Sequence, residues 1–332
     1  MNKVSQRDLF VTAADGTQIF VTDRGDIESR VTPLLCLPGL TRHSGDFEPV
    51  FDVHATSRRV IGIDFRGRGK SAHAIDPSSY RPQVELADVL SVLDHLKISR
   101  CAVLGTSRGG IVGMLMANVA PTRIAGLMLN DIGAELEPEG LLRILEHVGK
   151  PSRFRDWDDA AHKFSKSAIG FDDVTHTMWR SVVRRIFQYS NGSFVHRHDL
   201  RLMDSLPTKA EIKSGKVANL WSLLPALTEL PCSLLRGSGS DLLSLRTVGK
   251  MRAALPGLDY TEVSGRGHVP FLDEVESVAA MARWLAAVDA KEKGQAVTNS
   301  HMNLTVSIDV EESLVAPTSA PTGCTDLICY RE

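Results

Sequence analysis

The sequence predicts an α/β protein with a mostly parallel sheet and helices on both of its faces. Short, wholly apolar segments alternate along the chain with longer segments whose apolar residues recur at helical spacing. Strands buried on both faces are continuous apolar runs, and parallel neighbours need a helical connection between them. Several apolar runs also end in glycine-rich turns. Together these observations favour a doubly covered parallel sheet.

The predicted strands are short runs of apolar residues, and the first two form a hairpin. They alternate in polarity around Asp15-Gly16, a strong turn signal. The runs lie at residues 7–13, 17–23, 32–38, 59–64, 101–104, 124–130, 230–236 and 259–263. The predicted helices lie at residues 47–53, 82–96, 111–119 and 245–255, with a last one beginning at residue 274. Pro82 suits the first position of its helix.

The alternation of strands and helices stops near residue 134 and resumes near residue 230. The stretch between them has a helical pattern, is more polar, and carries several aromatic residues. We therefore expect a helical cap inserted into an α/β core. The predicted parts are a first core segment (1–134), the cap (135–218), a second core segment (219–290) and a polar, flexible tail (291–332). Within the tail only residues 304–310 have the pattern of a strand.

Composition narrows the class of protein and of partner. The formal net charge of −2 does not favour nucleic acid or an anionic membrane. The N-terminus has no apolar leader and no apolar run is long enough to span a bilayer, so a cytoplasmic protein is expected. Cys36, Cys101 and Cys232 fall inside predicted core strands, and no Cys/His grouping has metal-ligand spacing. We expect a small-molecule substrate and neither metal nor cofactor; the oligomeric state stays open.

Ser107 is the strongest candidate for a reactive residue. It lies in a Gly-x-Ser-x-Gly motif between a predicted strand and a predicted helix. A serine at such a corner holds its hydroxyl above the edge of the sheet, where the helix N-terminus favours a developing anion. Gly105 and Gly109 allow the strand, the corner and the helix to approach closely. This context predicts a serine nucleophile.

A serine nucleophile needs an imidazole base and a carboxylate that orients the base. His268 follows the last predicted strand, and Asp241 follows the strand before it. The order Ser107, Asp241, His268 is the one expected for this type of sheet. Asp131 also sits at a strand end and is the alternative acid. The histidines of the cap, which include His196 and His198, are expected to be solvated or structural.

These motifs resemble those of the α/β-hydrolase family, in its serine-nucleophile branch with a helical cap. The matching segments are residues 37–40, 64–71, 105–110, 236–241 and 267–268. The resemblance covers about residues 8–290. It implies an eight-stranded core sheet and a cap between the sixth and seventh strands. It also implies that Ser107 is the nucleophile, Asp241 the acid and His268 the base.

The resemblance further places an oxyanion hole on the backbone N–H groups of Leu40 and Arg108. Many members carry His-Gly where this chain has Pro38-Gly39, which leaves a backbone donor intact. The Arg108 guanidinium has two candidate partners, an acidic substrate or an acidic residue of the cap. The glycine-rich segment 64–71 has arginines suited to a phosphate, but it lacks the context of a P-loop, so a structural loop is favoured.

The sequence thus predicts a cofactor-independent serine hydrolase that cleaves a small carboxylic ester, a lactone or a related carbonyl compound through an acyl-enzyme. A serine nucleophile argues against the aspartyl-ester chemistry of haloalkane dehalogenases and epoxide hydrolases. A C–C bond hydrolase and a perhydrolase on the same triad remain alternatives. So does a non-catalytic ligand receptor on the same fold, since fold alone does not fix function.

Overall fold

The structure is a computed structural model that describes residues 5–312, with residues 296–312 described as helical backbone only. The chain divides into two compact units, residues 1–289 and residues 290–332. The first unit holds the sheet and the inserted segment. The described part of the second unit is the continuation of helix α9 (Val275–Glu312). In the described part of the chain, no helix combines the length and apolar character needed to cross a membrane.

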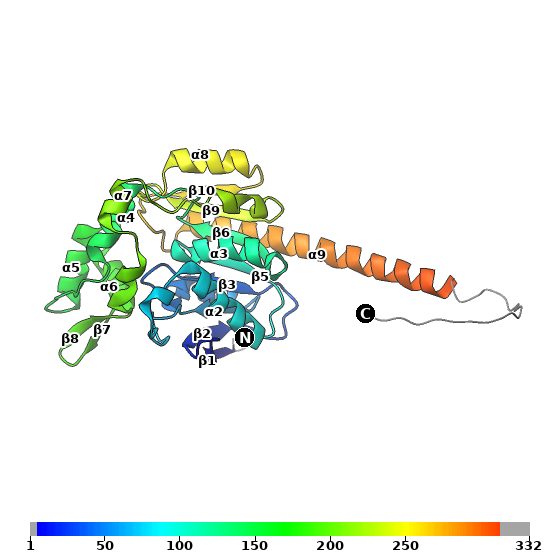
Figure 1. The fold of residues 1–332 in the computed structure, drawn as a ribbon, viewed down its shortest axis with the longest axis horizontal. Coiled ribbons are helices and arrows are strands. Elements are labelled where there is room, and N and C mark those ends of the chain that lie inside the picture. The colour runs from blue at the N-terminus through cyan, green and yellow to red at the C-terminus, as the bar shows by residue number, and fades with distance from the viewer. Residues whose placement is uncertain (1–4, 313–332) are drawn as a thin grey trace, which may run out of the picture. The chain divides into compact units, whose positions relative to one another are not determined.

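An eight-stranded sheet organises the first unit, in the spatial order β1-β2-β4-β3-β5-β6-β9-β10 (Figure 1). Its strands are β1 (Gln6–Thr12), β2 (Gln18–Arg24), β3 (Leu34–Leu37), β4 (Val60–Ile63), β5 (Cys101–Thr106), β6 (Ile124–Asn130), β9 (Cys232–Gly237) and β10 (Asp259–Val263). β2 pairs antiparallel with β1 and β4, and the other neighbours are parallel. The predicted hairpin and the mostly parallel sheet are confirmed.

Helices cover both faces of the sheet. Successive side chains of a strand point to opposite faces, so each wholly apolar strand gives the sheet two apolar faces to bury. Leu35 and Leu37 of β3 pack in one cluster, while Leu34 and Cys36 pack in the other. The first cluster includes residues of α2 (Pro82–His95), α3 (Arg108–Val119) and α8 (Leu245–Ala254). The second includes residues of α1 (Glu48–His54) and α9. The predicted two-sided α/β architecture is confirmed, and the three strand cysteines are buried.

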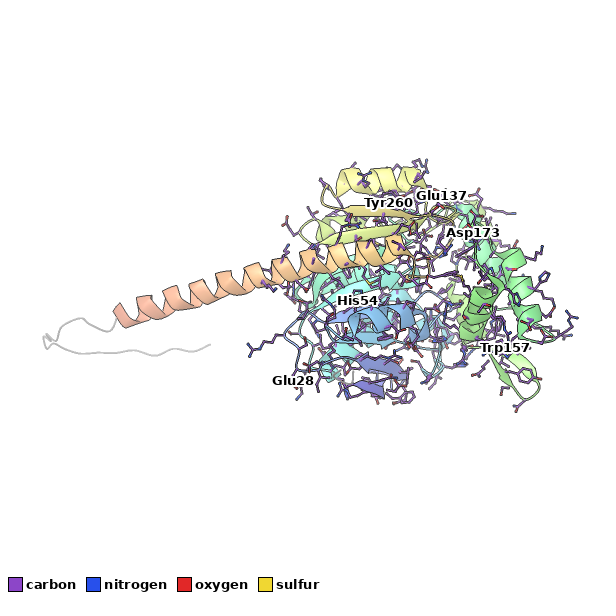
Figure 2. All side chains as sticks on the ribbon, turned by 180° about the vertical axis from the view of Figure 1, so that it is seen from behind. Glu28, His54, Glu137, Trp157, Asp173 and Tyr260 are labelled. Atoms are coloured by element: carbon purple, nitrogen blue, oxygen red, sulfur yellow. The ribbon has the colours of Figure 1, made fainter. Side chains whose placement is uncertain are left out.

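The segment between β6 and β9 is mainly helical. Its helices are α4 (Pro138–His147), α5 (Trp157–Ser167), α6 (His176–Ile186) and α7 (Lys209–Lys213). Aromatic side chains of this insertion form a cluster of their own, and Trp157 and Asp173 mark its position in Figure 2. The expected all-helical pattern is wrong at β7 (Phe187–Ser190) and β8 (Ser193–His196), which form an antiparallel hairpin. Asn191-Gly192 adopts positive φ between them, a turn signal that the sequence carried.

The C-terminal prediction also needs correction. Residues 304–310 belong to helix α9 and form no strand. The sequence from residue 275 to residue 312 contains no proline, so nothing in it forces the helix to stop. The flexible tail expected from residue 291 is helical as far as Glu312. Cys324 and Cys329 lie outside the described residues.

Candidate active site

Ser107 occupies a one-residue corner between β5 and α3. Its φ of 49° and ψ of −110° lie in a region of backbone conformation that residues other than glycine rarely adopt. The corner depends on the two flanking glycines. A Cβ on Gly105 would lie 2.5 Å from the Gly109 carbonyl oxygen, and a Cβ on Gly109 would lie 2.0 Å from the Leu37 carbonyl oxygen. The structure therefore has the strand–corner–helix arrangement that the motif predicts.

His268 lies in the loop between β10 and α9 and reaches Ser107. Its Nε2 is 3.0 Å from Ser107 Oγ, and its Nδ1 is 2.7 Å from Asp131 Oδ2. A carboxylate accepts only, so Nδ1 carries the proton and Nε2 is free to accept the serine hydroxyl. The serine, the imidazole and the carboxylate are thus connected in the order that nucleophilic catalysis requires.

Asp131 is fully buried directly after β6, in a backbone conformation with φ of 53°. Its Oδ1 accepts a hydrogen bond from the Gly237 N–H at 2.9 Å. Its Oδ2 accepts from Ser240 Oγ at 2.6 Å and from His268 Nδ1. Three donors therefore hold the carboxylate in one orientation, and this orientation fixes the tautomer of the histidine.

The prediction that Asp241 orients His268 is wrong in this structure. The Asp241 carboxylate pairs with the guanidinium of Arg143 on α4. Arg143 Nε donates to Asp241 Oδ2, and Arg143 Nη2 donates to Asp241 Oδ1 at 2.5 Å. The loop after β9 does reach the acid, but through the preceding residue, Ser240. The side chain of Asp241 instead turns to the insertion, where a cation is available. Asp131, the alternative in the sequence, is the carboxylate that contacts the histidine.

The two residues expected to supply oxyanion donors lie beside the serine. Arg108 is the first residue of α3, and the first N–H groups of a helix have no intrahelical acceptor. Leu40 belongs to the turn after β3, which lines the same cavity as Ser107. A Cβ on the preceding Gly39 would lie 3.9 Å from the Ser107 Cβ, so this turn runs next to the nucleophile. Their role as donors remains a prediction.

The guanidinium of Arg108 has a partner in the core that differs from those expected from the sequence. Its Nε donates to Glu85 Oε2 of α2 at 2.7 Å, rather than meeting the insertion. Glu85 is fully buried and also pairs with Arg68 at 2.8 Å, and Arg68 Nε donates to the Leu40 carbonyl at 2.7 Å. Burial by itself raises the pKa of Glu85, but the adjacent Arg68 and Arg108 outweigh it and lower that pKa. One buried carboxylate therefore links the elements that carry Leu40 and Arg108.

In the glycine-rich segment 64–71, the basic side chains that could have bound a phosphate contact other groups of the protein instead. Arg66 binds both carboxylate oxygens of Asp88 at 2.7 Å, and both side chains are buried. The backbone of the same loop holds the insertion. Gly69 N–H donates to the Arg197 carbonyl at 2.7 Å, and Asp199 N–H donates to the Gly67 carbonyl at 2.8 Å. These contacts are those of a structural loop.

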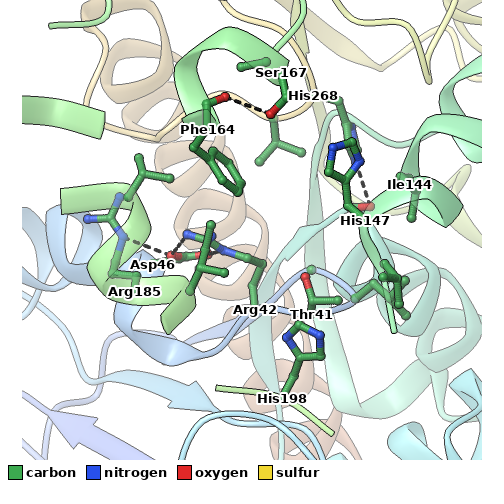
Figure 3. Close-up of a pocket in the computed structure, with 18 of the residues that line it drawn as sticks. Thr41, Arg42, Asp46, Ile144, His147, Phe164, Ser167, Arg185, His198 and His268 are labelled. Carbon is green, nitrogen blue, oxygen red and sulfur yellow. Dashed lines mark hydrogen bonds and ion pairs between the residues drawn. The ribbon is translucent and has the colours of Figure 1, made fainter. Parts of the chain in front are cut away.

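A cavity of about 480 Å³ opens above the serine, between the sheet edge and the insertion. Ser107, His268 and the turn after β3 line it from the core. The insertion contributes a mainly apolar wall that includes the aromatic residues Phe154, Phe164, Phe171, Trp179 and Phe187. Figure 3 shows the guanidinium groups of Arg42 and Arg185 directed at Asp46, a further polar feature of the cavity. The described residues contain no group of three side chains placed to hold a metal ion.

Comparison with known proteins assigns the family. The profile of the alpha/beta hydrolase family matches residues 34–281. The chain is 30% identical over 254 residues to the 3-hydroxybutyrate-oligomer hydrolase of Cupriavidus necator, covering 74% of this chain and 86% of that protein. It is 25% identical over 284 residues to a proline iminopeptidase of Lactobacillus delbrueckii, covering 77% and 90%.

A solved structure agrees with the sequence matches. It is the crystal structure of an alpha/beta hydrolase from Novosphingobium aromaticivorans, 36% identical to this chain. The two superpose with a TM-score of 0.77 over 86% of this chain and 99% of that one. The strand order, the corner serine and these matches lead to one conclusion: this chain is a hydrolase that belongs to the alpha/beta hydrolase family.

Proposed function

We propose that this hydrolase cleaves carboxylic esters through an acyl-enzyme formed on Ser107, with His268 as the base and Asp131 as the acid. The observation that carries this proposal is the continuous contact from Ser107 Oγ to His268 Nε2 at 3.0 Å and from His268 Nδ1 to Asp131 Oδ2 at 2.7 Å. Both distances lie in the range in which a base takes up a hydroxyl proton. Ser107 and His268 also line the cavity, where a substrate has access to them.

The reaction proceeds in two halves. Ser107 Oγ attacks the ester carbonyl while its proton passes to His268 Nε2, and the carbonyl oxygen becomes an oxyanion held by the N–H groups of Leu40 and Arg108. When the tetrahedral intermediate collapses, the ester C–O bond breaks and the leaving alcohol takes the proton from Nε2. Water then attacks the acyl-enzyme by the same route, which releases the acid and restores the serine. Asp131 stabilises the imidazolium ion in both halves.

Esters of short hydroxy acids are the substrate class that we favour. A relative that is 30% identical to the chain is named for the hydrolysis of 3-hydroxybutyrate oligomers. The aromatic wall of the insertion suits an acyl chain. The proline iminopeptidase relative supports amide hydrolysis as a second candidate, because an amide would pass through the same acyl-enzyme. Lactone hydrolysis, C–C bond hydrolysis and perhydrolysis would use the same three residues.

The first experiment measures turnover of p-nitrophenyl acetate and p-nitrophenyl butyrate by the wild type and by Ser107→Ala. We expect activity in the wild type, its loss in the variant, and stoichiometric labelling of the wild type by a fluorophosphonate probe. Prolyl p-nitroanilide, tested in parallel, separates ester from amide hydrolysis. Equal ester hydrolysis by both proteins would exclude Ser107 as the nucleophile. No turnover and no labelling would favour a ligand receptor.

A further inference from the structure

His198 lies in the wall of the catalytic cavity, and its ring nitrogens are buried. It follows β8, is 6% exposed, and is among the residues that line the cavity together with His268 (Figure 3). Among the described residues, neither Nδ1 nor Nε2 of His198 has a hydrogen-bond partner. The expectation that it is solvated or structural therefore does not account for this side chain. A buried polar group without a partner is unfavourable unless something else satisfies it.

The backbone of His198 is held firmly against the core. The residue forms a bridge to Arg68 of the glycine-rich loop. The next residue, Asp199, donates its N–H to the Gly67 carbonyl, and its Oδ2 accepts a hydrogen bond from the Tyr80 hydroxyl at 2.6 Å. On the other side, the Arg197 carbonyl accepts from the Gly69 N–H. The ring is thus presented to the cavity by a fixed segment, as a binding group needs to be.

The ring is neutral near neutral pH. Burial lowers the pKa of His198 to about 3, and the nearby His196, Arg68 and Arg42 act in the same direction, against the opposing charge of Asp199. A neutral imidazole offers one N–H donor and one acceptor nitrogen. The ring of His196 lies 4.6 Å away between centroids, and its Nδ1 is also buried without a partner among the described residues. Among the described residues, this part of the cavity therefore offers unpartnered ring nitrogens, and the His198 ring itself carries no positive charge near neutral pH.

The chemistry of this wall selects one kind of group. A hydroxyl group both donates and accepts, so it matches a neutral imidazole. A carboxylate can only accept and would lose hydration without gaining a counter-charge from the ring. An alkyl chain would leave the ring nitrogens unpaired.

We propose that His198 is a specificity-determining residue that binds the hydroxyl group of a hydroxyacyl ester. The inference rests on the proposed ester hydrolysis and deepens it by naming the group that is recognised. In an ester formed between two hydroxy acids, the free hydroxyl belongs to the acyl part. His198 accordingly binds the acyl chain whose carbonyl is attacked by Ser107.

The test compares ethyl 3-hydroxybutyrate with ethyl butyrate, by following acid release with a pH indicator. We expect the wild type to prefer the hydroxy ester by about tenfold or more in kcat/KM, a factor that corresponds to one hydrogen bond. His198→Phe keeps the size of the ring and removes both nitrogens, so the preference should fall to within about twofold. The loss of kcat/KM in this variant should be larger for the hydroxy ester than for ethyl butyrate. Ethyl 3-methoxybutyrate, which accepts but does not donate, should be a poorer wild-type substrate than the hydroxy ester.

A matched control is His147→Phe, because His147 also lines the cavity but has an exposed ring that contacts the Arg143 carbonyl. The preference of His147→Phe for the hydroxy ester should stay near that of the wild type. Fluorophosphonate labelling reports whether each variant is folded. If His198→Phe is not folded, His198→Leu replaces it as the test variant.

The outcomes separate this inference from the proposed function. Equal hydrolysis of the two ethyl esters by the wild type would overturn the role of His198 and leave ester hydrolysis intact. An undiminished preference in His198→Phe or His198→Leu would do the same. If the wild type hydrolysed neither ester and did not react with the fluorophosphonate, the proposed function would fail and the inference with it.

Discussion

Replacement of Asp131 by asparagine is the sharpest test of the triad, because the structure predicts which way the new amide will face. Oδ1 of Asp131 accepts the Gly237 N–H, so the amide oxygen of the asparagine must take that position. The amide nitrogen then occupies the position of Oδ2 and faces His268 Nδ1. An N–H group there donates to Nδ1 and forces the histidine proton onto Nε2, opposite the serine hydroxyl. His268 can then no longer accept the proton of Ser107.

The expected loss is large and falls on kcat. An equivalent exchange in a serine protease triad lowers kcat about 10⁴-fold through the same change of tautomer, which is about 5 kcal/mol of transition-state stabilisation. The assay is p-nitrophenyl butyrate hydrolysis under saturating and limiting substrate, together with the rate of fluorophosphonate labelling. KM should change little, because Asp131 is fully buried and is not among the residues that line the cavity.

The matched control is Asp241→Asn. The Asp241 and Arg143 side chains are each about one-fifth exposed, and the pair is expected to contribute no more than about 1 kcal/mol to stability. Its loss should leave kcat within about threefold of the wild type. The reasoning is refuted if Asp131→Asn retains more than a tenth of the activity, or if Asp241→Asn loses more than about a hundredfold.

Three further predictions follow from buried groups. Glu85→Gln leaves two buried guanidiniums without their carboxylate, so it should lower unfolding stability by about 3–5 kcal/mol and kcat by at least about tenfold. Asp88→Asn on the same helix breaks a comparable buried pair away from Leu40 and Arg108. Urea unfolding should show a similar cost there, and equal losses of kcat in both variants would contradict a positioning role for Glu85. Gly109→Ala forces a Cβ to within 2.0 Å of the Leu37 carbonyl oxygen, so thermal unfolding should show a clear loss of stability. Activity should fall with it. A melting temperature equal to that of the wild type would contradict the corner geometry. The pKa of His198 is lowered from 6.5 to about 3, so the unfolded chain binds more protons between these values and stability falls as pH drops from 6.5 towards 3. Urea unfolding at pH 7 and pH 5 should show a shallower fall for His198→Phe, by up to about 1.4 kcal/mol per pH unit, and identical slopes would contradict the buried neutral ring.

Local signals explain why much of the fold and two of the three residues of the proposed triad were predictable. Each buried strand is a continuous apolar run, and the apolar residues of each helix recur at helical spacing. The order of strands and helices therefore follows from short windows of sequence. Ser107 is identified by glycines within two residues of it, because the close contacts of Gly105 and Gly109 belong to the corner itself. His268 is identified by its place after the last strand. The β7–β8 hairpin also had a local signal in Asn191-Gly192, which the helical pattern around it obscured.

The sequence by itself determined the α/β architecture, the corner serine and the position of His268 after the last strand, because the physical causes lie in periodicity, glycine sterics and strand order. Only the tertiary structure decided which carboxylate contacts His268. Asp131 and Asp241 both follow strands that are neighbours in the sheet, but Arg143 of the insertion draws Asp241 away while Gly237 and Ser240 hold Asp131 in place. The same holds for His198, whose burial depends on the contact between the insertion and a loop more than a hundred residues earlier. Contacts between distant segments leave no pattern in the local sequence, so the carboxylate that contacts His268 and the burial of the His198 ring appear only once the chain is folded.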